Sequence, residues 1–202
     1  MNVGIFGGSF DPVHNAHCAL ARHALIELRL DELLWVPAGR PWQKDRTMTP
    51  ARHREAMVRL AIGGEPRFVL SRLELDRAGP SYTVDTVRAL HAARPGVDWH
   101  LVIGEDQYAR LPTWHGWQDL LGLVTLAVAA RTPAEPGAPG RADPPRLGVA
   151  HRVVALPPME VSSTDIRERL ARGQGIDDLV PAAVASYIAR HHLYRDPPPP
   201  RS

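Results

Sequence analysis

The sequence predicts a single Rossmann-like domain of the α/β class, in which helices cover both faces of a doubly wound parallel sheet. Short apolar runs alternate with amphipathic segments along most of its 202 residues, and this alternation is typical of strand–helix–strand units. The first apolar run ends at two adjacent glycines, Gly7 and Gly8, and a helical pattern begins soon after them. Because ligands bind such sheets at the carboxyl ends of the strands, we expect the functional site at these glycines.

Six strands are expected where short apolar runs occur, at 2–8, 33–37, 67–75, 99–103, 124–130 and 153–156. Helices are expected where apolar residues recur at helical spacing or follow capping residues, at 16–30, 50–62, about 83–94, 117–122, 163–173 and 181–192. Thr49 and Pro50 are expected to provide the N-cap and the first residue of the second helix. Ser163 and Thr164 are expected to cap the fifth.

We expect one domain over residues 1–195, without internal repeats. Within it, residues 132–148 are rich in proline and glycine and indicate a loop, which is either a lid or an insertion. The proline-rich tail, 196–202, is predicted to be disordered.

Composition argues against several classes of protein. The formal net charge is only +2, and neither a run of Lys and Arg nor a basic face with interleaved aromatic residues is evident, so nucleic acid is not an expected partner. No apolar run approaches the ~18 residues that span a membrane, and no signal-peptide pattern is present, so no membrane association is expected. Cys18 is the only cysteine, which rules out an intrachain disulfide and favours the cytoplasm.

The segment from Gly7 to His17 combines glycines, a helix start and two histidines. Gly7 and Gly8 have no Cβ, so a bulky anion can approach the backbone N–H groups closely. The helix start adds unpaired N–H groups and the positive end of the helix dipole, and His14 and His17 add side-chain donors. These features predict a polyphosphate site, although neither the Walker A nor the dinucleotide-binding pattern is present. The alternative for the two histidines, a metal pair, lacks a recognisable third ligand.

Residues 7–17 resemble the nucleotidylyltransferase superfamily pattern Gly-Gly-Ser/Thr-Phe-Asp-Pro-x-His-x-Gly-His, with Ala16 in place of the third glycine. A second segment, 161–167, resembles the family's Ile-Ser-Ser-Thr-x-Ile-Arg, with Val161 in place of the first isoleucine. Arg167 lies one turn inside a helix whose N-terminus would repel it unless an anion were bound there. The resemblance implies that the phosphates of ATP are bound by Gly7, Gly8, Ser9, Phe10, His14, His17, Ser163, Thr164 and Arg167.

Two further segments resemble bacterial nicotinate-mononucleotide adenylyltransferases: residues 80–86 look like their Pro-Ser-Tyr-Thr-x-x-Thr, and residues 112–114 look like their Pro-Thr-Trp. The resemblance implies that Trp114 stacks on the pyridine ring, with Trp117 as the competing candidate. It also implies that the segment from Thr83 and the backbone amides of Val84 and His115 receive the nicotinate carboxylate. Amides and helix dipoles suit a carboxylate better than a neutral carboxamide.

Four other residues are matched to the family one at a time. Lys44 falls where the family places a basic residue, although the preceding Trp-Gln replaces the family's Pro-His. Arg131 resembles the arginine that meets the mononucleotide phosphate, and Gly104 with Asp106 matches the Gly-x-Asp beside the adenosine. Asp106 could instead cap a helix. For Asp11, a place near the metal or the ribose and a role as a turn residue before Pro12 remain open alternatives.

The resemblance therefore implies adenylyl transfer from ATP to nicotinate mononucleotide, which gives deamido-NAD and pyrophosphate by in-line attack without a covalent intermediate. His14, His17, Lys44 and Arg167 are the expected catalytic residues. Mg²⁺ is expected to be held mainly by phosphates and water, with few protein ligands and no metal-binding residue singled out. The alternatives are a phosphopantetheine enzyme, whose family usually has Thr at the position of His14, a nicotinamide-mononucleotide enzyme, and a nucleotide sensor without catalysis. The sequence leaves the oligomeric state open.

Overall fold

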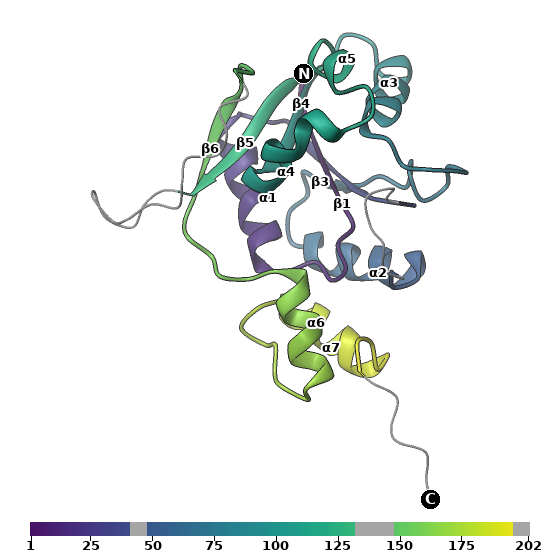
Figure 1. The fold of residues 1–202 in the computed structure, drawn as a ribbon, viewed down its shortest axis with the longest axis vertical. Helices are drawn as coiled ribbons and strands as arrows, with labels where there is room; N and C mark the ends of the chain where they lie inside the picture. The colour runs from purple at the N-terminus through teal and green to yellow at the C-terminus, as the bar shows by residue number, and fades with distance from the viewer. Residues whose placement is uncertain (41–47, 132–147, 196–202) are drawn as a thin grey trace, which may run out of the picture.

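A computed structural model describes residues 1–40, 48–131 and 148–195 of the chain. It contains a sheet of six strands in the order β3-β2-β1-β4-β5-β6, with every neighbouring pair parallel (Figure 1). The strands are β1 (Asn2–Gly8), β2 (Glu32–Pro37), β3 (Phe68–Leu70), β4 (Asp98–Gly104), β5 (Thr125–Arg131) and β6 (Arg152–Leu156). The helices are α1 (Asn15–Glu27), α2 (Ala51–Ile62), α3 (Thr83–Ala93), α4 (Glu105–Arg110), the 3₁₀ turn η1 (Leu111–Thr113), α5 (Trp117–Leu121), α6 (Ser163–Ala171) and α7 (Ala182–Arg190).

Side chains alternate along the strands between two apolar clusters, one on each face of the sheet. Phe6 and Trp35 point into the cluster that α1, α2, α6 and α7 cover. Ile5 and Val36 point into the cluster that α3, α4 and α5 cover. Because both faces are buried, the strands are nearly continuous apolar runs, as parallel strands typically are. The doubly wound α/β fold predicted from the sequence is confirmed.

The strand order reverses between β1 and β4. From β1 the chain winds outward to β2 and β3, then crosses back to β4 and continues to β5 and β6. At such a reversal the loops after the two central strands diverge and leave a crevice for a ligand. Here those loops begin at Gly8, after β1, and at Gly104, after β4.

Some local predictions were wrong. The third strand ends at Leu70 because the chain enters a turn, in which the N–H of Asp76 donates to the carbonyl of Arg72. Pro50 is the N-cap of α2, which begins at Ala51 rather than at Pro50 itself. The helix α4 was not predicted. It has only six residues, too few to be stable alone, and it depends on tertiary contacts such as the burial of Tyr108.

Lys44, most of the segment 132–148 and the tail 196–202 lie outside the described residues. Arg131 ends β5. Among the helices of residues 1–40, 48–131 and 148–195, none is both long and apolar enough to cross a membrane.

Candidate active site

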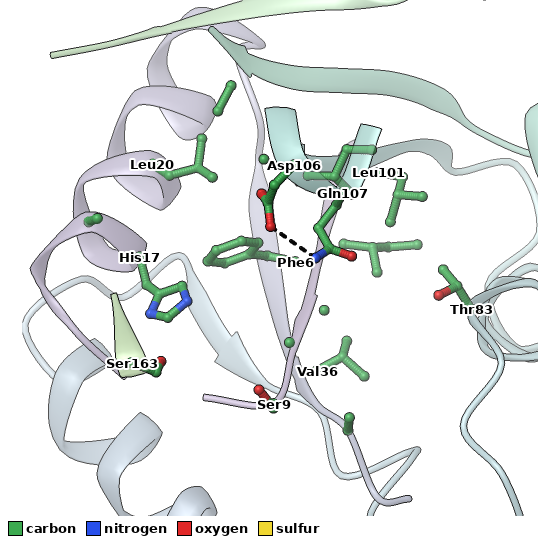
Figure 2. A pocket seen from close by; sticks show the side chains of 18 of the residues that line it. Phe6, Ser9, His17, Leu20, Val36, Thr83, Leu101, Asp106, Gln107 and Ser163 are labelled. Atoms are coloured by element: carbon green, nitrogen blue, oxygen red, sulfur yellow. Dashed lines mark hydrogen bonds between the residues drawn. The ribbon is translucent and has the colours of Figure 1, made fainter. Parts of the chain in front are cut away.

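A cleft of about 510 Å³ opens at the carboxyl ends of β1 and β4, where the strand order reverses. His17 of α1 and Ser163 of α6 lie on one side of it, and Thr83, the first residue of α3, lies on the opposite side (Figure 2). The predicted site residues among those that line the cleft are Gly7, Gly8, Ser9, His14, His17, Thr83, Gly104, Asp106, Trp114 and Ser163. The fold therefore gathers most of the predicted site from segments far apart in the sequence.

The two histidines form one unit at the start of α1. His14 is the N-cap, and its backbone N–H donates to Nδ1 of His17 over 3.2 Å. The two rings stack with their centroids 3.6 Å apart. Because Nδ1 of His17 accepts this bond, the proton of the neutral ring is on Nε2. The side-chain N–H of His17 is therefore on Nε2, and His17 is among the residues that line the cleft.

His14 is almost fully buried, and its Nδ1 has no hydrogen-bond partner within the described part of the chain. A buried polar atom without a partner is costly and is often explained by a ligand or a water molecule. Burial lowers the pKa of His14 to about 4, although the charge of Asp165 acts in the opposite direction. The ring is therefore neutral at pH 7 and carries a single N–H.

The low pKa of His14 predicts a pH dependence of stability. Between pH 6.5 and 4 the unfolded chain binds a proton at His14 that the folded protein does not bind, so the free energy of unfolding falls as the pH falls. We expect His14→Gln to remove up to about 3 kcal/mol of that fall. Denaturant unfolding of both proteins across this pH range measures the difference; parallel curves would contradict the burial of a neutral His14.

The second predicted phosphate motif, 161–167, is hydrogen-bonded to residues 7–14, here called the glycine-rich loop. Oγ of Ser163 donates to the carbonyl oxygen of Pro12 over 2.9 Å, and Nη1 of Arg167 donates to that of Asp11 over 2.8 Å. Nη2 of Arg167 donates to Oγ1 of Thr164 over 3.0 Å. The N-cap of α6 is Ser162, whose Oγ accepts the N–H of Asp165, so the predicted cap at Ser163 and Thr164 was one residue too late.

Of the residues predicted to contact the ring and the carboxylate, only Thr83 and Trp114 are among those that line the cleft. Val84, in the first turn of α3, is only 1% exposed as a whole residue and is not among those that line the cleft. Trp114 lines the cleft, and its Nε1 is buried without a partner among the described residues. Trp117 packs against the same apolar cluster but is not among the residues that line the cleft. The ring of His115 lies against that of Tyr82, with 4.4 Å between centroids.

Some predicted residues lie elsewhere. Phe10 is only 1% exposed, and its ring packs at 5.2 Å from that of His17, so it supports the histidine from the core. Asp106, by contrast, lines the cleft, but it does not cap α4, whose N-cap is Gly104. Asp11 is completely buried: Oδ1 accepts the hydroxyl of Tyr194 at 2.7 Å, and Oδ2 accepts the N–H of Thr49 at 3.3 Å. Its carboxylate therefore joins protein segments and does not face the cleft.

Sequence reasoning missed a polar network in the wall of the cleft. Oγ1 of Thr86 donates to the buried carboxylate of Glu74 over 2.8 Å, and burial raises the pKa of Glu74. Oγ of Ser81 accepts the N–H groups of Gly39 and Arg40, each at 3.1 Å. The network ties the loop after β2 to the segment before α3. Ser81 and Thr86 belong to the motif at 80–86, which was the available signal, whereas no sequence pattern marked Glu74.

A second missed residue is Arg54 of α2, which is only 2% exposed. Its Nη1 donates to the carbonyl oxygen of Ser9 and its Nε to that of Thr49, each over 3.0 Å. Arg54 thus supports the glycine-rich loop from the core. Within the described ranges, no three His, Cys, Asp or Glu side chains gather in a group that could hold a metal ion.

Comparisons with known proteins agree on one family. A family model described as cytidylyltransferase-like matches residues 5–169. A protein of Methylibium petroleiphilum named "probable nicotinate-nucleotide adenylyltransferase" is 52% identical, over 96% of this chain and 93% of its own. A protein of Bordetella petrii with the same name is also 52% identical, over 96% of this chain and 98% of its own.

Solved structures agree with the fold. The nicotinic acid mononucleotide adenylyltransferase of Plasmodium falciparum, complexed with NaAD, has a TM-score of 0.78 at 20% identity, over 96% of this chain and 97% of that one. Its complex with APC has a TM-score of 0.76 at 19% identity, over 96% of both chains. The sequence matches show that the chain belongs to the cytidylyltransferase-like family and, within it, to the nicotinate-nucleotide adenylyltransferases.

Proposed function

We propose that this chain transfers the adenylyl group of ATP to nicotinate mononucleotide, with deamido-NAD and pyrophosphate as products. The observation that carries the proposal is the two-sided cleft: His17 at the start of α1 and Ser163 at the start of α6 face Thr83 across it, and Trp114 also lines it. The names of the close relatives point to the same reaction. A substrate with one phosphate and one aromatic carboxylate fits this division of the cleft.

In the proposed reaction, an oxygen of the mononucleotide phosphate attacks the α-phosphorus of ATP. The bond between that phosphorus and the bridging oxygen to the β-phosphate breaks, and pyrophosphate leaves with the bond's electrons. A phosphate oxygen is already an adequate nucleophile, so the protein needs to position two anions and to stabilise the charge that develops on the leaving group. Nε2–H of His17 and the ring of His14 are the proposed side-chain donors for this purpose.

We propose that Mg²⁺ enters with ATP. A bound Mg²⁺ would neutralise part of the phosphate charge and would keep several water ligands. The described residues fit this mode because His14 and His17 offer neutral side-chain donors to the phosphates at the start of α1. We propose the cytoplasm as the compartment, because Cys18 is buried as a free thiol and the chain has no second cysteine.

Preference for nicotinate over nicotinamide is assigned to the start of α3. The backbone N–H of Val84 lies in the first turn, where N–H groups have no partner within the helix and the dipole favours an anion. A carboxylate gains from both, whereas a neutral carboxamide gains little and brings an N–H₂ group toward other donors.

Trp114→Ala is expected to raise KM for nicotinate mononucleotide roughly 10-fold with little change in kcat, because ring stacking acts in substrate and transition state alike. Steady-state kinetics at saturating Mg-ATP measure both constants. Trp117→Ala is the matched control, since Trp117 belongs to the same apolar cluster outside the cleft lining. An unchanged KM in Trp114→Ala, with a raised KM in Trp117→Ala, would transfer the stacking role to Trp117.

Pyrophosphate release tests the proposed function. The protein is given Mg-ATP with nicotinate mononucleotide, nicotinamide mononucleotide or phosphopantetheine in parallel. Release with the nicotinate compound well above the others supports the proposal. Faster release with another acceptor would keep the phosphate-binding half and overturn the roles of Val84 and Trp114. ATP binding without release in any assay would favour the nucleotide sensor.

A further inference from the structure

The last part of the chain shares the apolar cluster of the glycine-rich loop, although it lies beyond residue 169, where the family match ends. Val180 and Ile188 are buried in the same cluster as Phe10 and Val13. The helices α6 and α7 lie together at one end of the molecule (Figure 1). Residues 176–194, here called the C-terminal segment, thus pack against the buried side chains of the glycine-rich loop.

Hydrogen bonds join the C-terminal segment to residues that precede and follow His14 in the sequence. Before it, the hydroxyl of Tyr194 donates to Oδ1 of Asp11 over 2.7 Å. After it, the backbone N–H of Asn15 donates to the carbonyl oxygen of Leu179 over 2.9 Å. The side-chain Nδ2 of Asn15 donates to the carbonyl oxygen of Asp178, also over 2.9 Å. The chain at Asp11 and the chain at Asn15 are therefore both attached to the same segment.

The contact between Tyr194 and Asp11 is a bond to a buried charge. Burial and the negative charge of Asp11 both raise the pKa of Tyr194, so the phenol keeps its proton and remains a donor. Hydrogen bonds to charged groups are stronger than those between neutral groups. The backbone of Tyr194 is left-handed, with φ of 63°, a conformation that an aromatic residue keeps only where its surroundings hold it.

We propose that the C-terminal segment positions the His14–His17 pair, and that Tyr194 is the positioning residue that does so through Asp11. The link runs from Asp11 along the backbone to His14, whose N–H donates to Nδ1 of His17. A shift of the chain between Asp11 and Asn15 displaces that N–H, turns the ring of His17 and moves its Nε2–H relative to the phosphates. This inference rests on the proposed function, which assigns the two histidines to ATP.

The test compares Tyr194→Phe with Tyr187→Phe. Tyr187 lies on α7, packs against the same apolar cluster, and shares a 3.0 Å hydrogen bond with Nδ1 of His53 on α2, away from the loop. Each variant loses one hydroxyl and keeps its ring. Kinetics with Mg-ATP and nicotinate mononucleotide are combined with hydrogen exchange of the backbone amides of residues 7–17, at a temperature where thermal unfolding shows every variant to be folded.

We expect Tyr194→Phe to lower kcat roughly 10-fold, the scale on which a small displacement of catalytic groups acts, and to speed exchange in 7–17. Tyr187→Phe is expected to keep wild-type values of both, even if it unfolds at a lower temperature. Asn15→Ala, which removes the side-chain bond to Asp178, is expected to change both measurements in the same direction as Tyr194→Phe.

Wild-type kcat in Tyr194→Phe would overturn the proposal, whatever the exchange shows. An equal loss of kcat in Tyr187→Phe would also overturn it, because the effect would then come from general loosening of α7. Failure of the proposed function is distinguishable, since the unaltered protein would then release no pyrophosphate. In that case, faster exchange of residues 7–17 in Tyr194→Phe alone would still support the proposal that the hydrogen bond between Tyr194 and Asp11 holds the glycine-rich loop in place. Unchanged exchange would reject that proposal.

Discussion

Replacement of His17 by alanine is expected to lower kcat by at least ~10²-fold, the scale of losing one positioned donor to developing charge. The reason is its place in the unit at the start of α1. Its Nδ1 accepts the backbone N–H of His14, and this bond fixes the orientation of the ring and therefore of Nε2–H. An alanine removes this donor and leaves the N–H of His14 without its partner.

Turnover is measured as pyrophosphate release at saturating substrates, with circular dichroism and thermal unfolding to verify the fold. His23→Ala is the matched control, because His23 lies on the same helix and its ring contacts Glu27 rather than the cleft. We expect wild-type turnover in this control. Near-normal turnover in His17→Ala would remove His17 from the mechanism.

Arg167→Ala is expected to lower kcat/KM by about 10²-fold, because it removes both a cation and the fork that joins two elements of the site. One arm of the guanidinium bonds the carbonyl oxygen of Asp11 and the other bonds Oγ1 of Thr164. Arg167→Lys is expected to recover only part of the loss, since an ammonium group does not reproduce the planar fork.

The control for Arg167 is Arg169→Ala, which removes the same charge from an exposed position on the same helix. Measurement of KM for ATP and for the mononucleotide separately is expected to place the binding loss on ATP. Equal effects of the two alanine variants would mean that overall charge, and not the fork of Arg167, accounts for the loss.

Local sequence patterns were sufficient to predict the architecture and the place of the cleft in it. Alternating apolar and amphipathic segments predicted the parallel sheet, and the pair Gly7 and Gly8 predicted the edge of the sheet at which the cleft opens. These predictions succeeded because strand and helix periodicity, turn residues and helix starts depend on neighbours a few residues apart. The two phosphate motifs meet because the carboxyl ends of parallel strands share one edge of the sheet.

The positions of Asp11, Arg54, Glu74 and Tyr194 were decided only by the tertiary structure. Asp11 and Tyr194 are 183 positions apart, and Arg54 reaches Ser9 across 45 positions. No local pattern distinguishes a buried charged residue from an exposed one when its partner lies on another element. Whether a carboxylate faces a substrate or the core depends on which segments the sheet order brings behind it, and the energetic cost of burying a charge selects those that find a partner there.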